Sequence, residues 1–421
     1  MNRAAASRKI TLAVSLALFS FPLSRTVVRA DDADAVQRAA DLAEPVRLID
    51  ADHPVAAPFV ADVDGDGAAE LLVGEYRRAA YTEAGFRVYH RIGKPSDLKF
   101  DAGNWLQAAG RDATVPAFCY TGSAPQVVDF NGDGIPDVVS QAMTGNRDEA
   151  VLRVFPGEGK GRFGEPTDVT YLTVTKSSPR LTCYNVRAFV YDWDGDGNPD
   201  VLATYIGGRG IWLVRHSGDR GKNSYSAPEA LEVDGDALRG GKSICMADWD
   251  GDGRDDLIVG NDGVQWYRNM SPRGEPKLAA GVTLIPPGKF SSVRYSQSEQ
   301  YPPPQAPSGP LRVCVADVTG DGRMDLIVGD VAGATAVGPT PTKEQTLALE
   351  AAWRRMTVAR DAYYKLKSAD PPTTAEARVL YDGNLELRRA ECSAIDREIE
   401  QLKPERYERH GSVWLFRRLA K

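Results

Sequence analysis

The stretch "YDWDGDGNPDVLA" at Tyr191–Ala203 places four aspartates among glycines and an asparagine, directly ahead of a short apolar run. The same pattern occurs five times in the chain at near-regular spacing. The other copies are "ADVDGDGAAELLVG" at Ala61–Gly74, "VDFNGDGIPDVVS" at Val128–Ser140, "ADWDGDGRDDLIVG" at Ala247–Gly260 and "ADVTGDGRMDLIVG" at Ala316–Gly329. Self-similarity of this kind indicates one supersecondary unit per copy.

Counted from its first aspartate, each motif offers side-chain oxygens at positions 1, 3, 5 and 9 and a backbone carbonyl at position 7. Oxygen ligands at this spacing can surround a hard cation, and glycines at positions 4 and 6 let the backbone fold around it. Calcium suits such flexible coordination better than magnesium does, so we predict up to five structural calcium ions. The predicted ligands are Asp62, Asp64, Asp66, Ala68, Glu70, Asp129, Asn131, Asp133, Ile135, Asp137, Asp192, Asp194, Asp196, Asn198, Asp200, Asp248, Asp250, Asp252, Arg254, Asp256, Asp317, Thr319, Asp321, Arg323 and Asp325.

The motifs differ in the acids that they supply. Asn131 and Thr319 replace the acid at position 3, and Glu70 replaces the aspartate at position 9 of the first motif. We therefore expect the third and fourth motifs to bind calcium most tightly, and the second and fifth more weakly.

Two other interpretations of the motif disagree with the residues around it or with its number of copies. An EF-hand loop ends on a glutamate at position 12 and lies between helices. Here position 12 is apolar or small, and the flanking runs are short and apolar, which is typical of strands. A catalytic acid cluster would require five equivalent active sites. Strand, calcium loop and strand is the interpretation that fits.

With its following apolar residues, the pattern D-x-[DNT]-G-D-G-x-x-D resembles the FG-GAP or VCBS repeats of the integrin α-subunit head and of many exported bacterial proteins, from which Glu70, Asn131 and Thr319 are departures. The resemblance covers roughly residues 44–335 and the last ten or so. It implies an all-β fold, a β-propeller with one four-stranded blade per repeat. It also implies calcium in the loop that joins the first two strands of each blade.

Further strands can be assigned between the motifs. Aromatic-rich runs predict third strands at Phe86–Ile92, Val151–Phe155, Gly210–His216 and Val264–Met270. Predicted fourth strands are Leu98–Leu106, Gly164–Leu172, Ala227–Val233 and Gly274–Leu284.

The fifth repeat has a third strand only at Ser412–Arg418, where the chain ends. Its fourth strand is predicted at Ala43–Asp50, whose Glu-Pro start matches "GEPTDVT" and "GEPKLAA". We expect five four-stranded blades, with the N-terminal strand closing the last one, although more blades with degenerate motifs are an alternative. Closure of this kind removes exposed strand edges.

Residues 341–405 are predicted to form an α-helical hairpin inserted into the fifth blade. Thr342 with Gln345, and Thr373 with Glu376, have the spacing of capping boxes, and "SADPP" at Ser368–Pro372 separates the two helices. The hairpin is interpreted as a docking or oligomerisation element, or as a decoration without such a role.

Residues 1–30 are predicted to be a signal peptide, because Arg8 and Lys9 precede an apolar run at Ile10–Leu23 and small residues flank Arg29. That run is shorter than the roughly 20 residues that span a bilayer, although an uncleaved anchor is the alternative. We expect a linker at 31–42, a propeller at 43–418 and an exported mature chain with no transmembrane segment. A disulfide between Cys119 and Cys183 is one alternative to buried thiols.

The formal net charge of −7 gives no support to nucleic-acid binding. In related propellers, ligands bind the face opposite the calcium loops. The resemblance places these candidates on that face: Glu75, Arg77, Gln141, Arg147, Tyr205, Arg209, Asn261 and Asp330. We expect a non-catalytic binding or adhesion module for an extracellular glycan or protein. The alternative is a polysaccharide-active enzyme such as a lyase.

Overall fold

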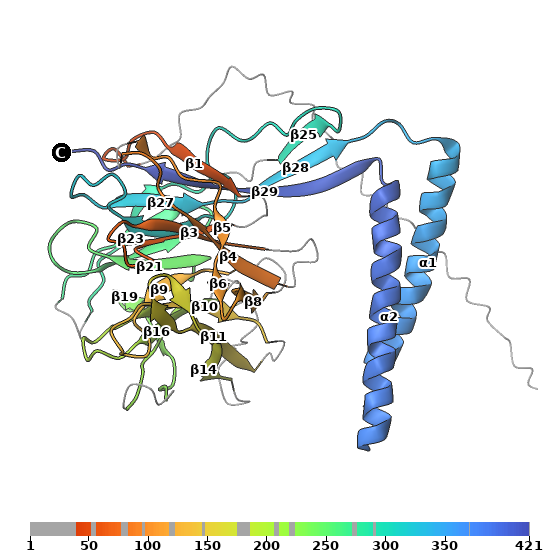
Figure 1. Cartoon of the computed structure of the whole chain (residues 1–421), viewed down its shortest axis with the longest axis horizontal. Helices are drawn as coiled ribbons and strands as arrows, with labels where there is room; N and C mark the ends of the chain where they lie inside the picture. The colour runs from red at the N-terminus through yellow and green to blue at the C-terminus, as the bar shows by residue number, and fades with distance from the viewer. Residues whose placement is uncertain are drawn as a thin grey trace, which may run out of the picture. The chain divides into compact units, whose positions relative to one another are not determined.

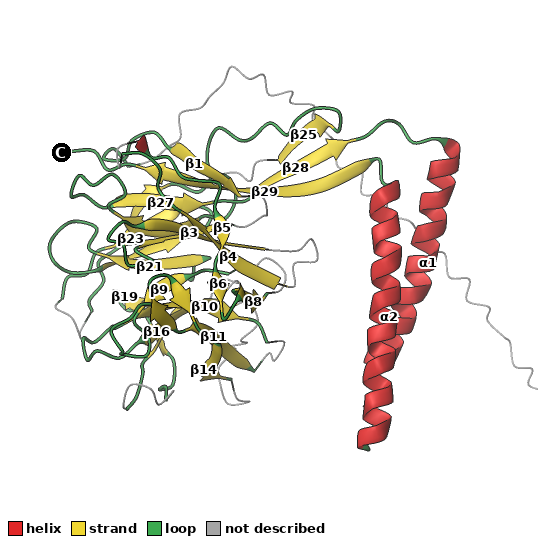
Figure 2. Cartoon of the chain, viewed as in Figure 1, coloured by secondary structure: helices red, strands yellow, loops and turns green. Residues whose placement is uncertain are grey.

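The computed structural model describes residues 39–51, 56–76, 83–94, 97–117, 123–144, 148–174, 186–205, 210–218, 224–271, 276–288, 292–369 and 371–420, whose elements Figure 1 traces along the chain. These residues are mostly in strands and loops, and their two α-helices are α1 (Lys343–Lys367) and α2 (Ala375–Leu402) (Figure 2). The predicted signal peptide, most of the predicted linker, Cys119 and Cys183 lie outside the described residues. Within them, neither helix combines the length and apolar character needed to cross a membrane.

Each motif lies between the first two strands of an antiparallel sheet, and we number the sheets first to fifth by their motifs. The first sheet pairs β2 (Ala57–Ala61), β3 (Glu70–Tyr76), β4 (Glu83–Tyr89) and β5 (Asn104–Trp105). The second pairs β9 (Gln126–Val128), β10 (Asp137–Ala142), β11 (Glu149–Phe155) and β14 (Thr167–Thr173), and the third pairs β15 (Val186–Tyr191), β16 (Asp200–Tyr205), β17 (Ile211–Val214) and β18 (Glu229–Ala230). The fourth pairs β21 (Ser243–Ala247), β22 (Asp256–Gly260), β23 (Val264–Tyr267) and β24 (Val282–Ile285), and the fifth pairs β26 (Arg312–Ala316), β27 (Asp325–Gly329), β29 (Glu405–Phe416) and β1 (Val46–Ala51).

The remaining strands add to these sheets or form small ones. β8 (Thr114–Pro116) pairs with β4, and β28 (Ala332–Val337) pairs with the first half of β29 and with β25 (Ser292–Ser296). A small sheet and a short hairpin account for β12 (Gly157–Gly159), β13 (Arg162–Phe163), β6 (Gln107–Ala108), β7 (Arg111–Asp112), β19 (Glu232–Val233) and β20 (Asp236–Ala237).

The register between first and second strands is the same in all five sheets. The acid at position 9 begins the second strand and pairs with the residue just before position 1. These pairs are Ala61 with Glu70, Val128 with Asp137, Tyr191 with Asp200, Ala247 with Asp256 and Ala316 with Asp325. Each motif is therefore one turn of fixed length between two paired strands.

Each second strand is buried on both faces, because alternate side chains enter two different hydrophobic cores. On β27, Ile327 packs in a core shared with the first sheet, whereas Leu326 and Val328 pack in a core shared with the fourth. The other shared cores join the first sheet to the second, the second to the third and the third to the fourth. Every sheet therefore shares a core with two others, and the last shares one with the first.

The glycine that ends three of the motifs permits close approach of the next sheet. A Cβ atom built on Gly329 would lie 2.1 Å from the carbonyl oxygen of Ala56, and one on Gly74 would lie 2.3 Å from that of Ser123. On Gly260 it would lie 2.5 Å from the carbonyl oxygen of Leu311. Backbone contact at these points leaves no space for a side chain.

The N-terminal strand pairs as the sequence predicts. Val46 faces Leu415 and Ile49 faces Val413, so β1 is the outer neighbour of β29. The predicted third strands match β4, β11, β17 and β23 in position. Several boundaries were wrong: β29 begins at Glu405 rather than near Ser412, and β4 begins at Glu83 rather than Phe86. The fourth strands predicted at Leu98–Leu106 and Gly274–Leu284 correspond to the shorter strands β5 and β24. The fourth strand predicted at Ala227–Val233 is divided between β18 and β19, which belong to different sheets.

The helical hairpin has a hydrophobic core of its own. Ala352, Met356 and Ala359 of α1 pack with Ile395 and Ile399 of α2, and the two helices lie side by side in Figure 1. The capping box of Thr342 and Gln345 forms as predicted, whereas α2 is capped by Thr374 rather than Thr373. Exposed apolar side chains remain on both helices, among them Val358, Val379 and Leu387. A docking or oligomerisation role stays a prediction.

Two glycine substitutions should have opposite effects. Gly329→Ala should lower the free energy of unfolding by about 2 kcal/mol, since its Cβ would overlap the Ala56 carbonyl. Gly383→Ala should raise the stability of the hairpin by up to about 1 kcal/mol, because Gly383 lies in α2 with open space around its Cα. Chemical denaturation of the wild type and of Gly329→Ala measures the first effect. Hydrogen exchange of the α2 amides in the wild type and in Gly383→Ala measures the second. Equal stabilities for wild type and Gly329→Ala would contradict the packing.

Candidate metal centres

The aspartate at position 1 closes the turn in every motif. Its Oδ1 accepts the N–H of the glycine at position 4 at 2.7–2.9 Å, and its Oδ2 accepts that of the glycine at position 6 at 2.8–3.2 Å. All these glycines have φ angles between 72° and 90°, a left-handed backbone that glycine adopts without steric cost. The pairs are Asp62 with Gly65 and Gly67, Asp129 with Gly132 and Gly134, Asp192 with Gly195 and Gly197, Asp248 with Gly251 and Gly253, and Asp317 with Gly320 and Gly322.

The aspartate at position 5 stabilises the second half of the turn. Its Oδ1 accepts the N–H of residue 7 at 2.7–3.0 Å in all five motifs. The residues at position 7 are Ala68, Ile135, Asn198, Arg254 and Arg323. Ala68 and Ile135 can contribute only their backbone to this bond. The side chains of Asn198, Arg254 and Arg323 also donate to the other oxygen of the position 5 aspartate.

The acid at position 9 connects the turn to the third strand. Asp200 accepts the N–H of Trp193 at 2.9 Å through Oδ2 and that of His216 at 2.7 Å through Oδ1. In the second, fourth and fifth motifs the donor is likewise the second residue after the third strand, at 2.7–2.9 Å: Gly157 to Asp137, Asn269 to Asp256, and Arg418 to Asp325. Sequence reasoning assigned position 9 only to a metal and missed this bridge. The sole sequence signal for it was that an acid begins each apolar strand.

These five acids are at most 2% exposed. Burial raises the pKa of Glu70, Asp137, Asp256 and Asp325 above the ordinary value and that of Asp200 to about 6, and backbone N–H donors oppose the rise. A bound cation would also oppose it, since a positive charge favours the ionised carboxylate.

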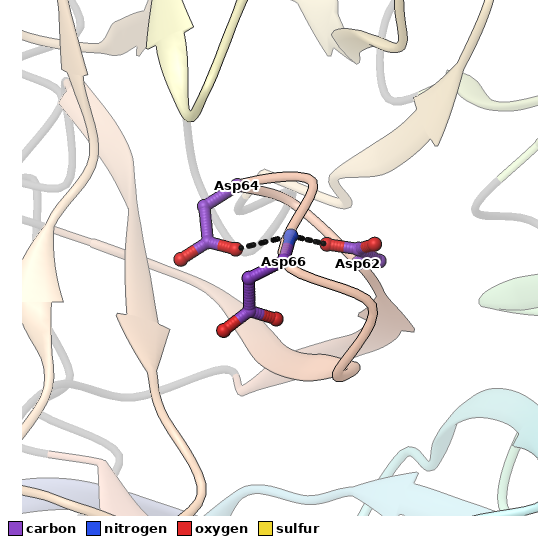
Figure 3. Close-up of side chains that lie close together, drawn as sticks. All are labelled: Asp62, Asp64 and Asp66. Carbon is purple, nitrogen blue, oxygen red and sulfur yellow. Dashed lines mark hydrogen bonds between the residues drawn. The ribbon is translucent and has the colours of Figure 1, made fainter.

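Three of the motifs bring three carboxylates together. Ligand oxygens lie within 4.8 Å of one another in three sets: Asp62, Asp64 and Asp66; Asp192, Asp194 and Asp200; Asp248, Asp250 and Asp256. In the first set, the Asp66 N–H donates to both Asp62 and Asp64, at 3.1 Å in each case (Figure 3). Asn131 and Thr319 replace the position 3 acid in the other two motifs. Among the described residues, the sets coincide with the motifs that have acids at positions 1, 3 and 5.

The donor chemistry at these sets fits a hard cation. In the fourth motif, the Oδ1 atom of Asp250 is buried and accepts no hydrogen bond from any described group. A buried carboxylate oxygen without a donor is costly unless a cation satisfies it. The other oxygen of Asp250 pairs with the Nε of Arg268 at 2.5 Å, and Arg268 also donates to Asp252 at 2.7 Å. The residues present therefore fit calcium, which would compete there with a guanidinium group.

The predicted ligand-face residues are placed differently from one another. Glu75, Gln141 and Asp330 are buried, and Asn261 is exposed. Asp330 accepts the N–H groups of Ser308 and Ser412 and the indole N–H of Trp414, at 2.7–3.0 Å. Its carboxylate therefore connects segments of the fold. Arg77, Arg147, Arg209 and the side chain of Tyr205 lie outside the described residues. A ligand role for these eight residues stays a prediction.

The structure repeats one unit, a strand, an acidic turn and a second strand, with a similar hydrogen-bond network each time. This repetition places the protein in the class of β-repeat proteins. The FG-GAP-like repeat family matches residues 129–203, 192–259 and 248–328, and each match runs from the first aspartate of one motif to the strand after the next. Residues 129–328 of the chain therefore contain three consecutive FG-GAP-like repeats.

Among solved structures, a chain of the Photorhabdus luminescens Tc holotoxin pore is 16% identical, with a TM-score of 0.33. The match covers 68% of this chain and 14% of the toxin chain, so this chain spans a small part of that relative's length. A likeness at this level does not bear on function.

The bridge at position 9 should matter without any metal. Asp137→Ala should lower the free energy of unfolding by about 3 kcal/mol, because it leaves the buried N–H groups of Phe130 and Gly157 without their acceptor. Denaturation in calcium and in EDTA should show similar losses, since the second motif lacks an acid at position 3. Asp133→Asn, in the same loop but exposed, is the matched control and should change little in EDTA. A loss confined to the calcium-containing sample would contradict the bridge.

Proposed function

We propose that the five sheets form a closed five-bladed β-propeller, in which β1 completes the blade that contains the chain's last strand. The shared cores support closure, since the first sheet packs against the fifth as well as the second. Residues at the starts of all five first strands, or just before them, also line one cavity. In such a ring few strand edges remain open to pairing with other chains.

The acidic turns are proposed to bind up to five structural calcium ions, most tightly where three carboxylates meet. The observation that carries this proposal is the buried Asp250 Oδ1, which no described donor satisfies. Calcium would supply charge neutralisation to oxygens that the turn network already holds close together. Position 1 and position 5 aspartates orient the turn, and position 9 fixes it to the third strand.

The chain is proposed to be an exported, non-catalytic binding or adhesion module that acts in the periplasm or outside the cell on a glycan or protein. The three FG-GAP-like repeats support a binding module. The predicted signal peptide supports export, and extracellular calcium would saturate sites of moderate affinity. With calcium proposed at the acidic turns, the opposite ends of the strands are left for a ligand.

Calcium should stabilise the full chain against heat. A site that binds only the folded state contributes about 2.7 kcal/mol at a hundredfold excess of calcium over its Kd. Asp194→Asn should remove much of one such contribution, whereas Asp361→Asn, an exposed acid on α1, should change nothing. Thermal unfolding in calcium and in EDTA, with calorimetric titration, measures both effects. Identical melting temperatures in calcium and EDTA, with no calorimetric binding, would overturn the calcium proposal.

The binding role has its own test. A glycan array and incubation with acidic polysaccharides distinguish a binding module from the alternative, a lyase. Retention of a glycan without the appearance of unsaturated products supports the module. Release of unsaturated sugars by the purified chain would overturn the non-catalytic role.

A further inference from the structure

The helical hairpin carries more than half of the large apolar side chains that the described residues expose. Thirteen such side chains are exposed, and seven of them belong to α1 and α2. The four most exposed, at 68–72%, are Val358 on α1 and Val379, Leu380 and Leu387 on α2. Apolar groups that gather on an exposed surface usually mark a contact with a partner. The concentration on α2 therefore directs attention to that helix.

The exposed leucines of α2 belong to a stripe along one side of the helix. Leu380 and Leu387 alternate at intervals of three and four residues with the small residues Gly383, Ala390 and Ala394. All five residues are exposed. Alternating intervals of three and four are the spacing at which two helices pack along their length. We call residues 380, 383, 387, 390 and 394 the α2 stripe.

The α2 stripe is separate from the face that α2 turns toward α1. Ile395 and Ile399 pack in the core of the hairpin, with Cys392 and Leu402 partly buried against it. At 3.6 residues per turn, that face lies roughly 120° around the helix from the stripe. α2 therefore buries one apolar face within the hairpin and presents a second that no described residue covers.

Gly383 is a residue of the stripe that the isolated chain does not explain. Glycine in the interior of a helix is less favourable than alanine. A Cβ atom built on Gly383 would have no atom within 4 Å, so packing within the chain does not exclude a side chain there. Close approach of a second helix does favour small residues at the contact. A partner helix would give this glycine a reason.

Charges at the two ends of the stripe indicate the chemistry of the partner. The same spacing continues to Glu376 on one side and to Arg397 on the other, and both side chains are exposed. Antiparallel pairing of two α2 helices brings Glu376 of one copy within about one helical turn of Arg397 of the other, at both ends. Parallel pairing would place each charge beside its own counterpart, which is unfavourable. The stripe is thus complementary to itself in the antiparallel orientation.

The sizes of the apolar residues favour the same orientation. In an antiparallel pair, the leucines of one stripe face the small residues of the other, so each large side chain meets a small one. In a parallel pair, leucine would meet leucine and Gly383 would meet Gly383 in separate layers. The second arrangement leaves gaps at the small residues, which close packing disfavours.

We propose that the chain forms a homodimer through antiparallel pairing of two α2 stripes. The stripe extends over roughly 21 Å of helix. A contact of this length belongs to the small end of specific interfaces, and we expect a dissociation constant on the order of 10 μM. The dimer goes beyond the proposed binding function and does not depend on it. Two copies held together would engage a repeated ligand more tightly than one copy does.

Sedimentation velocity of the full chain, at concentrations that bracket this constant, tests the proposal. Wild type should shift from monomer to dimer as its concentration rises. Leu387→Glu should weaken the dimer at least about tenfold, because each copy would bring a charge into the apolar contact. Val358→Glu, at an equally exposed position on the outer face of α1, is the matched control and should dimerise as wild type does. Circular dichroism of each variant verifies that the helices are retained.

A charge exchange tests the antiparallel orientation. Arg397→Glu should weaken the dimer at least about threefold, because it places a glutamate beside Glu376 of the partner copy. Adding Glu376→Arg to the same chain should restore the affinity of wild type. Failure of the double exchange to restore the dimer would overturn the antiparallel arrangement.

The remaining outcomes decide whether the α2 stripe is the contact. A wild type that stays monomeric at every concentration would overturn the proposal, and so would a dimer that Leu387→Glu leaves unchanged. Dimerisation should be equal in calcium and in EDTA, at a temperature where the chain is folded in both. The dimer therefore stands if the calcium proposal fails. A dimer lost in EDTA from a folded chain would place the contact elsewhere and overturn the role of the stripe.

Discussion

The buried acid at position 9 is the constraint on which each repeat depends. It begins the second strand in all five repeats. In the second, third and fifth repeats it accepts N–H groups both from the turn and from the segment after the third strand, as Asp200 does with Trp193 and His216. Because burial disfavours its charge, the carboxylate needs these donors. The same contacts fix where the turn begins, and so where the oxygens of positions 1, 3 and 5 converge. The position 9 acid thus influences both the arrangement of the strands and the place where the metal-ligand oxygens converge.

Packing between sheets follows from the strand that this acid begins. Its apolar residues alternate between two cores, so a continuous run such as "LIV" serves two neighbours at once. Glycine at the end of the run lets the next first strand approach at backbone distance, as Gly329 does at Ala56. Small residues such as Ala57 and Ala124 line a cavity at the strand starts, together with the buried Arg187 and Arg312. Each first strand therefore begins near this cavity and ends at an acidic turn that hydrogen bonds hold in place.

Sequence reasoning located the turns, the first three strands of most sheets and the pairing of Val46–Ile49 with the last strand. It succeeded there because these features depend on local spacing or on a repeated dipeptide such as Glu-Pro. The bridges from position 9 and the meeting of Arg187 with Arg312 could not be predicted, since both depend on contacts between residues distant in the sequence. The division of Ala227–Val233 between two sheets was missed for the same reason. Asp330 was predicted to lie on the ligand-binding face because it is polar, but its side chain is buried.

Diffraction from crystals of the full chain grown with calcium, measured for anomalous scattering, tests the central claim most directly. The account predicts peaks among Asp192, Asp194 and Asp200 and among Asp248, Asp250 and Asp256, with Arg268 displaced from Asp250. It also predicts that the position 9 acids keep their bonds to the segments after the third strands. Well-ordered turns without anomalous peaks, with Arg268 still paired to Asp250, would contradict it.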